Sequence, residues 1–239
     1  MIDYVEVDGL GSVRVQRRKG SRSIRISVSQ NGAIKLSMPY RTSITTGIEF
    51  LQQKRTWIQK HASSPAPKLG DGARIGKAHT LLVSNNDSSK SRVTLTDTTI
   101  MVRLPANTNE QSMQPKLIDA SKKALQREAQ NLLPKQLEVY AQKYNYRVAS
   151  VSVKPLQSRW GSCSNKNDIV LNTFLIQLPW QFIDYVILHE LAHTLHHNHS
   201  SDFWNEVALR VPAYKDIRHT LKKFPTAVFD SRHIEHFVS

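Results

Sequence analysis

Hydrophobic and polar residues alternate along the first forty residues of the chain. The alternation is clearest in residues 23–28 and 33–38, where every second side chain is apolar, as in a strand with one buried face. The pair Asn31-Gly32, between these two stretches, is typical of a tight hairpin turn. Residues 4–39 are therefore predicted to form a β-meander.

Apolar positions three or four residues apart then predict helices. One amphipathic helix is expected over residues 43–61, and a helical pattern covers residues 117–144, where Pro134 must kink the helix or divide it in two. A second β section lies between these helices, and the polar residues 105–115 are expected to form a connector. The predicted organisation is a β-rich part with one helix at residues 1–110 and a second part at residues 111–239.

The later part of the chain has the pattern of a hairpin followed by helices. Residues 158–164 and 169–175 flank a short polar turn, and a helix is expected to begin near Pro179, since proline is tolerated in a first turn. The pair Ser200-Ser201 offers an N-cap for the next helix, and a last helical stretch is expected to reach about Phe224.

The first of these helices carries the motif His189-Glu190-x-x-His193. Residues four apart lie on the same face of a helix, so the two imidazoles can reach one ion. Glu190 is displaced from His189 by roughly 100° around the helix axis, which suits a general base acting on a metal-bound water. The motif therefore predicts a zinc hydrolase.

A third histidine follows at the spacing of a third ligand. His199 lies six residues after His193, so the helix is expected to end near His197 or Asn198, with Asn198 in the left-handed conformation that turns the chain back. Three protein ligands and a water make the open tetrahedral site of a catalytic zinc ion, and one Zn²⁺ per chain is expected. Glu206, on the following helix, is the alternative third ligand if His199 points away.

Composition narrows the classes of protein to consider. The 239 residues contain a single cysteine, Cys163, which excludes an intrachain disulfide and is compatible with a reducing compartment. No stretch approaches 18 uninterrupted apolar residues, and the chain start lacks the features of a signal peptide, so we expect a soluble, cytoplasmic protein without membrane contact. The net charge of +14 predicts attraction to nucleic acid or to other acidic partners.

Five parts of the sequence also carry a family resemblance. They are residues 23–39, Glu49-Phe50-Leu51 with Trp57-Ile58, Arg159-Trp160-Gly161-Ser162-Cys163, Tyr185 to His193, and Asn198-His199-Ser200 with Phe203-Trp204. Together they span about residues 17–225 and resemble the YgjP-like zinc metallopeptidases, which are related to the SprT-like proteases of the zincin superfamily. The segment around Trp160 discriminates this family better than the zinc motif does.

The resemblance implies an α+β fold. It implies a zincin-like catalytic core, made of a small antiparallel or mixed sheet and an active-site helix, together with an N-terminal β-rich part. It also implies His189, His193 and His199 as zinc ligands and Glu190 as the catalytic residue. Metzincins share the third-histidine spacing but have glycine at the position of His196 and a downstream methionine turn. All four methionines here lie at or before residue 113, so a metzincin is disfavoured.

The expected reaction is zinc-assisted hydrolysis of peptide bonds in peptides or unfolded proteins. Candidate contacts to the substrate or to the oxyanion are Arg159, Tyr214, Arg218 and His219. Two alternatives come from other classes of protein. The basic surface could recruit a protease or binding protein to DNA- or RNA-bound proteins, or the zinc could stabilise a catalytically silent scaffold. The presence of Glu190 disfavours the scaffold, because a structural zinc site has no need of that carboxylate.

Overall fold

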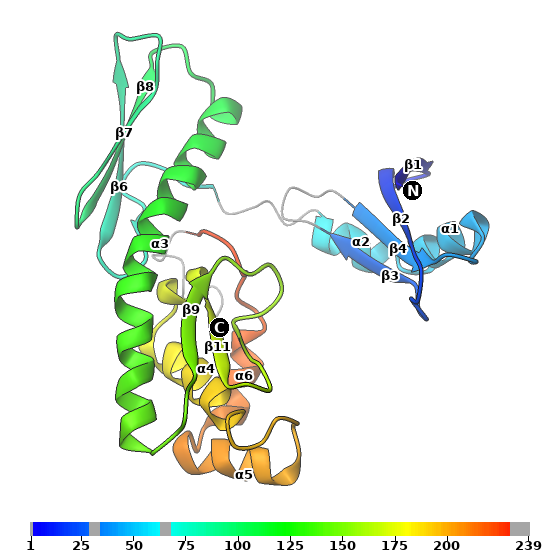
Figure 1. The fold of residues 1–239 in the computed structure, drawn as a ribbon. Coiled ribbons are helices and arrows are strands. Elements are labelled where there is room, and N and C mark those ends of the chain that lie inside the picture. Colours follow the sequence, from blue (N-terminus) through cyan, green and yellow to red (C-terminus); the bar gives the residue numbers. More distant parts are fainter. Residues whose placement is uncertain (1, 29–33, 63–67, 230–239) are drawn as a thin grey trace. The chain divides into compact units, whose positions relative to one another are not determined.

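The structure is a computed structural model that describes residues 2–28, 34–62 and 68–229 (Figure 1). The chain divides into two compact units, residues 1–67 and residues 68–239. The described residues form six α-helices and eleven strands in three small sheets, which confirms the α+β class. In the same ranges, no helix is both long enough and apolar enough to cross a membrane. The functional division expected near residue 110 stays a prediction.

The N-terminal unit contains a four-stranded sheet made of β1 (Ile2–Val7), β2 (Gly11–Arg18), β3 (Arg25–Val28) and β4 (Ile34–Pro39). The strand order is β1-β2-β4-β3, with β2 and β4 parallel and the outer pairs antiparallel. Alternate side chains of β4 are buried, as the sequence pattern predicts. The turn expected at Asn31-Gly32 lies outside the described residues.

Two helices follow this sheet where the sequence predicts one. α1 (Ile44–Gln53) is capped by Ser43, and α2 (Arg55–Ala62) begins after a break at Lys54. The single helix expected over residues 43–61 is therefore wrong at its centre, because Lys54 leaves the helical conformation, with φ −100° and ψ 11°. The two helices nevertheless add Leu51 and Ile58 to one buried cluster with the strands.

The second unit contains two sheets. The first has the order β5-β6-β8-β7, and its central strands β6 and β8 are parallel; its strands are β5 (Arg74–Ile75), β6 (His79–Asn86), β7 (Arg92–Leu95) and β8 (Thr99–Pro105). The other has the order β10-β11-β9, and its strands are β9 (Ser150–Lys154), β10 (Gly161–Cys163) and β11 (Asp168–Asn172). β10 and β11 form the antiparallel hairpin expected from the sequence, and β11 pairs in parallel with β9.

A single long helix, α3 (Glu110–Lys143), contacts both sheets of this unit (Figure 1). It corrects one expectation and narrows another, since of the two effects expected of Pro134 it excludes division. The connector expected at residues 105–115 is largely helical, because the Asn109 side chain accepts a hydrogen bond from the Ser112 backbone N–H at 2.9 Å and starts the helix at residue 110. Pro134 does not divide the helix, although it removes one backbone hydrogen bond. Leu133 and Leu137, on either side of it, are buried in the core and hold both halves of the helix in place.

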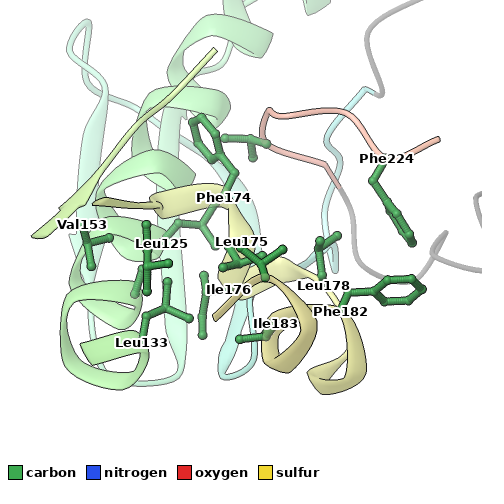
Figure 2. Packing of buried hydrophobic residues seen from close by; sticks show 14 of the residues in the cluster. Leu125, Leu133, Val153, Phe174, Leu175, Ile176, Leu178, Phe182, Ile183 and Phe224 are labelled. Atoms are coloured by element: carbon green, nitrogen blue, oxygen red, sulfur yellow. The ribbon is translucent and has the colours of Figure 1, made fainter. Parts of the chain in front are cut away.

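The core of this unit is one cluster that joins α3, both sheets and the segments that follow the second sheet. These segments are η1 (Thr173–Gln177), α4 (Trp180–Ala192), α5 (Ser201–Arg210) and α6 (Tyr214–Leu221). Figure 2 shows Leu125 and Leu133 of α3 beside Ile176 of η1 and Ile183 of α4, all of them buried. The core therefore packs against α4 along its length, and α4 carries the His189-Glu190-x-x-His193 motif.

Candidate metal centre

The helix α4 presents the motif from a rigid position. It begins at Trp180, as expected, and its side chains are buried at nine of thirteen positions. Ile187, Leu188 and Leu191 lie in the core on either side of His189 and Glu190. A helix held in this way fixes the direction of the His189 side chain before any ligand binds.

The end of α4 differs from the sequence expectation. The helix ends at Ala192, earlier than the expected end near residues 197–198, and His193 is its C-cap. The following N–H groups of Thr194 and Leu195 donate to carbonyls three residues back, at 2.9 and 3.1 Å, so the last turn tightens instead of continuing. Asn198 does not take the expected left-handed conformation, which among the described non-glycine residues is confined to Asn145 and Asn167.

The tightened turn and the N-cap of α5 together bring His199 back to the other two histidines. Ser200 accepts a hydrogen bond from the Phe203 N–H at 3.4 Å and so starts α5 directly after His199. The ligand atoms of His189, His193 and His199 all lie within 4.8 Å of one another. The Nε2 atoms of His189 and His199 are 3.3 Å apart. Two imidazole nitrogens at this distance suit a shared cation, since a neutral imidazole has a lone pair on one nitrogen.

Hydrogen bonding and burial keep the imidazoles in the form that binds metals. The Nδ1–H of His193 donates to the backbone carbonyl of His196 at 3.0 Å, which leaves its Nε2 as the unprotonated nitrogen. Burial lowers the pKa of His189 to about 3, and the neighbouring positive charges act in the same direction. Burial also lowers the pKa of His193. Both rings are therefore neutral at physiological pH, as metal ligation requires.

Two aromatic residues of α5 hold the three imidazoles. The fully buried ring of Phe203 lies 4.4 to 4.9 Å from all three, measured between ring centroids. Trp204 stacks on His199, with centroids 5.4 Å apart and planes inclined by 29°. His199 is exposed and lies outside any helix, so the contacts with Phe203 and Trp204 are what hold its ring in place.

Glu190 is a buried carboxylate beside the histidines. Only 5% of the residue is exposed, and its Oε2 atom has no hydrogen-bond partner within the described part of the chain. Burial raises the pKa of Glu190 to about 8, and the positive charge of Arg159 opposes this shift. An unpaired buried carboxylate is costly unless a cation or a substrate proton compensates it. This side chain therefore fits a site that holds a metal ion.

Gly161 makes room for that carboxylate. A Cβ atom at this position would lie 2.7 Å from both Cγ and Oε1 of Glu190, which is closer than real Cβ contacts. Strand β10 can therefore pass over Glu190 only because residue 161 has no side chain. This contact explains the glycine of the Arg159–Cys163 segment on steric grounds.

His189, His199 and Glu190 line a pocket of about 610 Å³. Arg159 and Arg218, two of the candidate substrate contacts, also line it. Tyr214 and His219 are not among the lining residues. Tyr214 stacks instead on the Trp204 ring, with centroids 5.3 Å apart, and so supports the pocket wall from behind.

The carboxylate of Glu206, the alternative ligand, is directed to other partners. It accepts hydrogen bonds from the Tyr146 hydroxyl and from Arg210 Nε, the latter at 3.0 Å. Burial and this hydrogen bond raise the pKa of Tyr146 to about 12, so the phenol remains a donor. Glu206 is not part of the cluster formed by the three histidines.

Three residues of the site were not singled out from the sequence. Tyr185 and Lys222 line the pocket, and Asn172, which is fully buried, organises the loop that carries Arg159. The Asn172 side-chain amide donates to the carbonyls of Leu156 and Arg159, at 2.9 and 2.8 Å. A polar residue that ends the apolar run of β11 was the available signal for Asn172. No local sequence pattern indicates that Tyr185 and Lys222 line the pocket.

Comparison with known proteins places the chain in a family. Residues 22–224 match the family model described as YgjP-like, metallopeptidase domain. Among solved structures, the metallopeptidase zymogen abylysin of Pyrococcus abyssi is 29% identical, with a TM-score of 0.35, over 38% of this chain and 94% of that one. The zymogen jannalysin of Methanocaldococcus jannaschii is 21% identical, with a TM-score of 0.34, over 38% and 93%. A search of curated proteins found no match. On the match that covers most of its length, the chain belongs to the YgjP-like metallopeptidase family.

Proposed function

We propose that the chain is a zinc-dependent peptidase that hydrolyses peptide bonds in peptides or unfolded proteins. In this proposal His189, His193 and His199 hold one zinc ion, and Glu190 is the general base. The observation that carries it is the convergence of three imidazoles next to a buried carboxylate whose Oε2 has no hydrogen-bond partner among the described residues. Three nitrogen donors without a cysteine suit a catalytic zinc site more than a structural one.

The chemistry divides between the metal and the chain. A bound zinc ion would polarise the scissile carbonyl and make the attacking water more acidic. Glu190 would accept the proton of that water and deliver it to the leaving amine. The raised pKa of Glu190 supports this role, since a carboxyl group that titrates near neutral pH can both accept and return a proton.

Substrate binding and oxyanion stabilisation are assigned to neighbouring groups. β10 is an edge strand of its sheet and borders the pocket through Gly161, so an extended peptide could pair with it. Arg159 and Arg218 are the candidates for the oxyanion contact that line the pocket. Tyr185 adds a third, because burial raises its pKa to about 12 and keeps the phenol protonated.

The general-base assignment is tested with Glu190→Gln. We expect the variant to bind one zinc ion per chain, measured by atomic emission, and to lose cleavage of a denatured protein by several orders of magnitude. Gln keeps the shape of Glu but cannot accept the proton. A variant that retains zinc and cleaves as well as the wild type would disprove the assignment.

The third ligand is tested with a matched pair. His199→Ala should lower zinc affinity strongly, whereas Glu206→Gln should bind zinc as the wild type does, because Glu206 contacts Tyr146 and Arg210. Loss of zinc in the Glu206 variant alone would restore the alternative ligand.

A nucleic-acid partner, expected from the net charge, stays a prediction. Its test is the salt dependence of binding to a DNA duplex. A steep loss of affinity with rising salt would support it, and no binding at low salt would remove it.

A further inference from the structure

The pocket beside the candidate metal site carries an excess of positive charge. Arg159, Arg218 and Lys222 line it, and Glu190 is the only carboxylate among its lining residues. Glu190 is almost fully buried, so it offers little negative surface. Within the described ranges, none of the three cations forms an ion pair with an acidic side chain. The fold thus leaves three exposed cations unneutralised at one opening.

The arginine of α6 contacts the aromatic wall of the pocket. The guanidinium carbon of Arg218 lies over the Trp204 ring, 4.7 Å from its centroid, a cation–π distance. A guanidinium can donate two parallel hydrogen bonds to one carboxylate. Lys222 follows Arg218 by four residues and therefore lies on the same side of the helix end.

Arg159 is placed from a different part of the chain. Its backbone carbonyl accepts a hydrogen bond from the buried amide of Asn172 at 2.8 Å, which fixes the loop before β10. The cations therefore approach the pocket from two elements far apart in sequence. Between them the lining is largely apolar, with Trp160, Val186, Leu221 and Phe224.

We propose that this pocket recognises a carboxylate of the substrate, and that the enzyme selects peptides with that carboxylate close to the scissile bond. Cations beside apolar side chains such as Trp160 and Leu221 fit a substrate group in which a short apolar stem carries a carboxylate. Two sources offer this chemistry: a Glu or Asp side chain, and the free C-terminal carboxylate of a peptide. The inference rests on the proposed peptidase function and adds its substrate class.

The test begins by mapping the bonds cleaved in a denatured protein by mass spectrometry. One cleaved sequence is then made as four peptides, with Glu or Gln at the selected position and with a free or amidated C-terminus. We expect kcat/KM to be about tenfold or more higher for the peptides that carry the selected carboxylate, a size typical of one charge-assisted hydrogen bond. A difference between the Glu and Gln peptides shows that the pocket binds the side-chain carboxylate. A difference between the free and amidated peptides shows that it binds the C-terminal carboxylate.

Variants then assign the selectivity to the pocket. Arg218→Gln should bring the ratio of the two kcat/KM values close to one, and Arg218→Glu should favour a Lys peptide over the Glu peptide. The matched control is Lys215→Gln, an exposed cation of the same helix that does not line the pocket and should leave the ratio unchanged. A second readout is the affinity of Glu190→Gln for the intact Glu and Gln peptides, which should differ in the same direction without any turnover.

The outcomes separate the two proposals. No cleavage by the wild type defeats the peptidase assignment, whereas full cleavage by Glu190→Gln defeats only the general-base role of Glu190. Cleavage that depends on Glu190 but is equal for carboxylate and amide peptides defeats the carboxylate pocket and leaves the peptidase intact. A DNA oligonucleotide that binds the wild type and fails to bind Arg218→Glu, with no peptide preference, would overturn the proposal in favour of phosphate recognition.

Discussion

Replacement of Gly161 by alanine should damage catalysis more than folding. The added Cβ would lie 2.7 Å from Cγ and Oε1 of Glu190, and ordinary contact begins at 3.4 Å, so the carboxylate must move by about 0.7 Å. Glu190 is the part that gives way, because it is a side chain whereas β10 is tied by its backbone to β11. The predicted result is an intact fold in which Glu190, the proposed general base, is displaced.

The magnitudes follow from this displacement. Misplacing a catalytic group by nearly 1 Å costs on the order of 100-fold in rate, so kcat/KM should fall by about that factor. Overpacking of a buried site costs about 1–3 kcal/mol, which corresponds to a fall in Tm of roughly 2–12 °C. Zinc content should not change, because the three atoms nearest the added methyl group all belong to Glu190.

The assay compares Gly161→Ala with Gly70→Ala. A Cβ at Gly70 would meet nothing within 4 Å, so this control should keep wild-type activity. Tm, bound zinc and cleavage of a denatured protein are measured on both variants. In a Glu190→Asp background the added methyl should destabilise the fold less, since the shorter side chain leaves more room. Activity of Gly161→Ala within twofold of the wild type would refute the steric argument.

Three further predictions concern groups around and beyond the site. Trp204→Leu removes the ring stacked on His199. Zinc affinity, measured by competition with a chelating dye, should therefore fall about 10- to 100-fold. Unchanged affinity would show that the stacking does not position His199. Glu128→Gln weakens the buried contact of residue 128 with His79, which is 3.1 Å long. The free energy of unfolding, measured in urea, should fall by about 1–3 kcal/mol, and a variant as stable as the wild type would contradict this role of the contact. Burial raises the pKa of the Cys163 thiol to about 11, so thiol labelling at pH 8 should be on the order of 100-fold slower than for free cysteine and should quicken tenfold per pH unit. Rapid labelling at pH 8 would argue against that burial.

Local sequence patterns correctly predicted the elements whose bounds depend on residues close together in the chain. The start of α4, the β10–β11 hairpin and the N-cap of α5 at Ser200 are confirmed, because helix caps and hairpin turns are encoded within a few residues. The expectations that failed depend on distant contacts. The β-meander predicted over residues 4–39 is wrong, because β2 pairs in parallel with β4 instead of with β3, and no local pattern encodes that pairing.

The sequence by itself determined that His189 and His193 lie on one face and that Glu190 flanks them, since helix geometry alone sets those positions. It also indicated the family and offered His199 as a third ligand. Only the tertiary structure decided how His199 returns, through a tight turn after Ala192 and the stacking of Trp204. The tertiary structure also decided that Glu190 is buried under Gly161. It likewise brought Arg159 and Arg218, which come from separate elements, to one pocket. The burial of a side chain and the pairing of its charge depend on contacts between segments that are distant in sequence. Local sequence patterns do not encode those contacts.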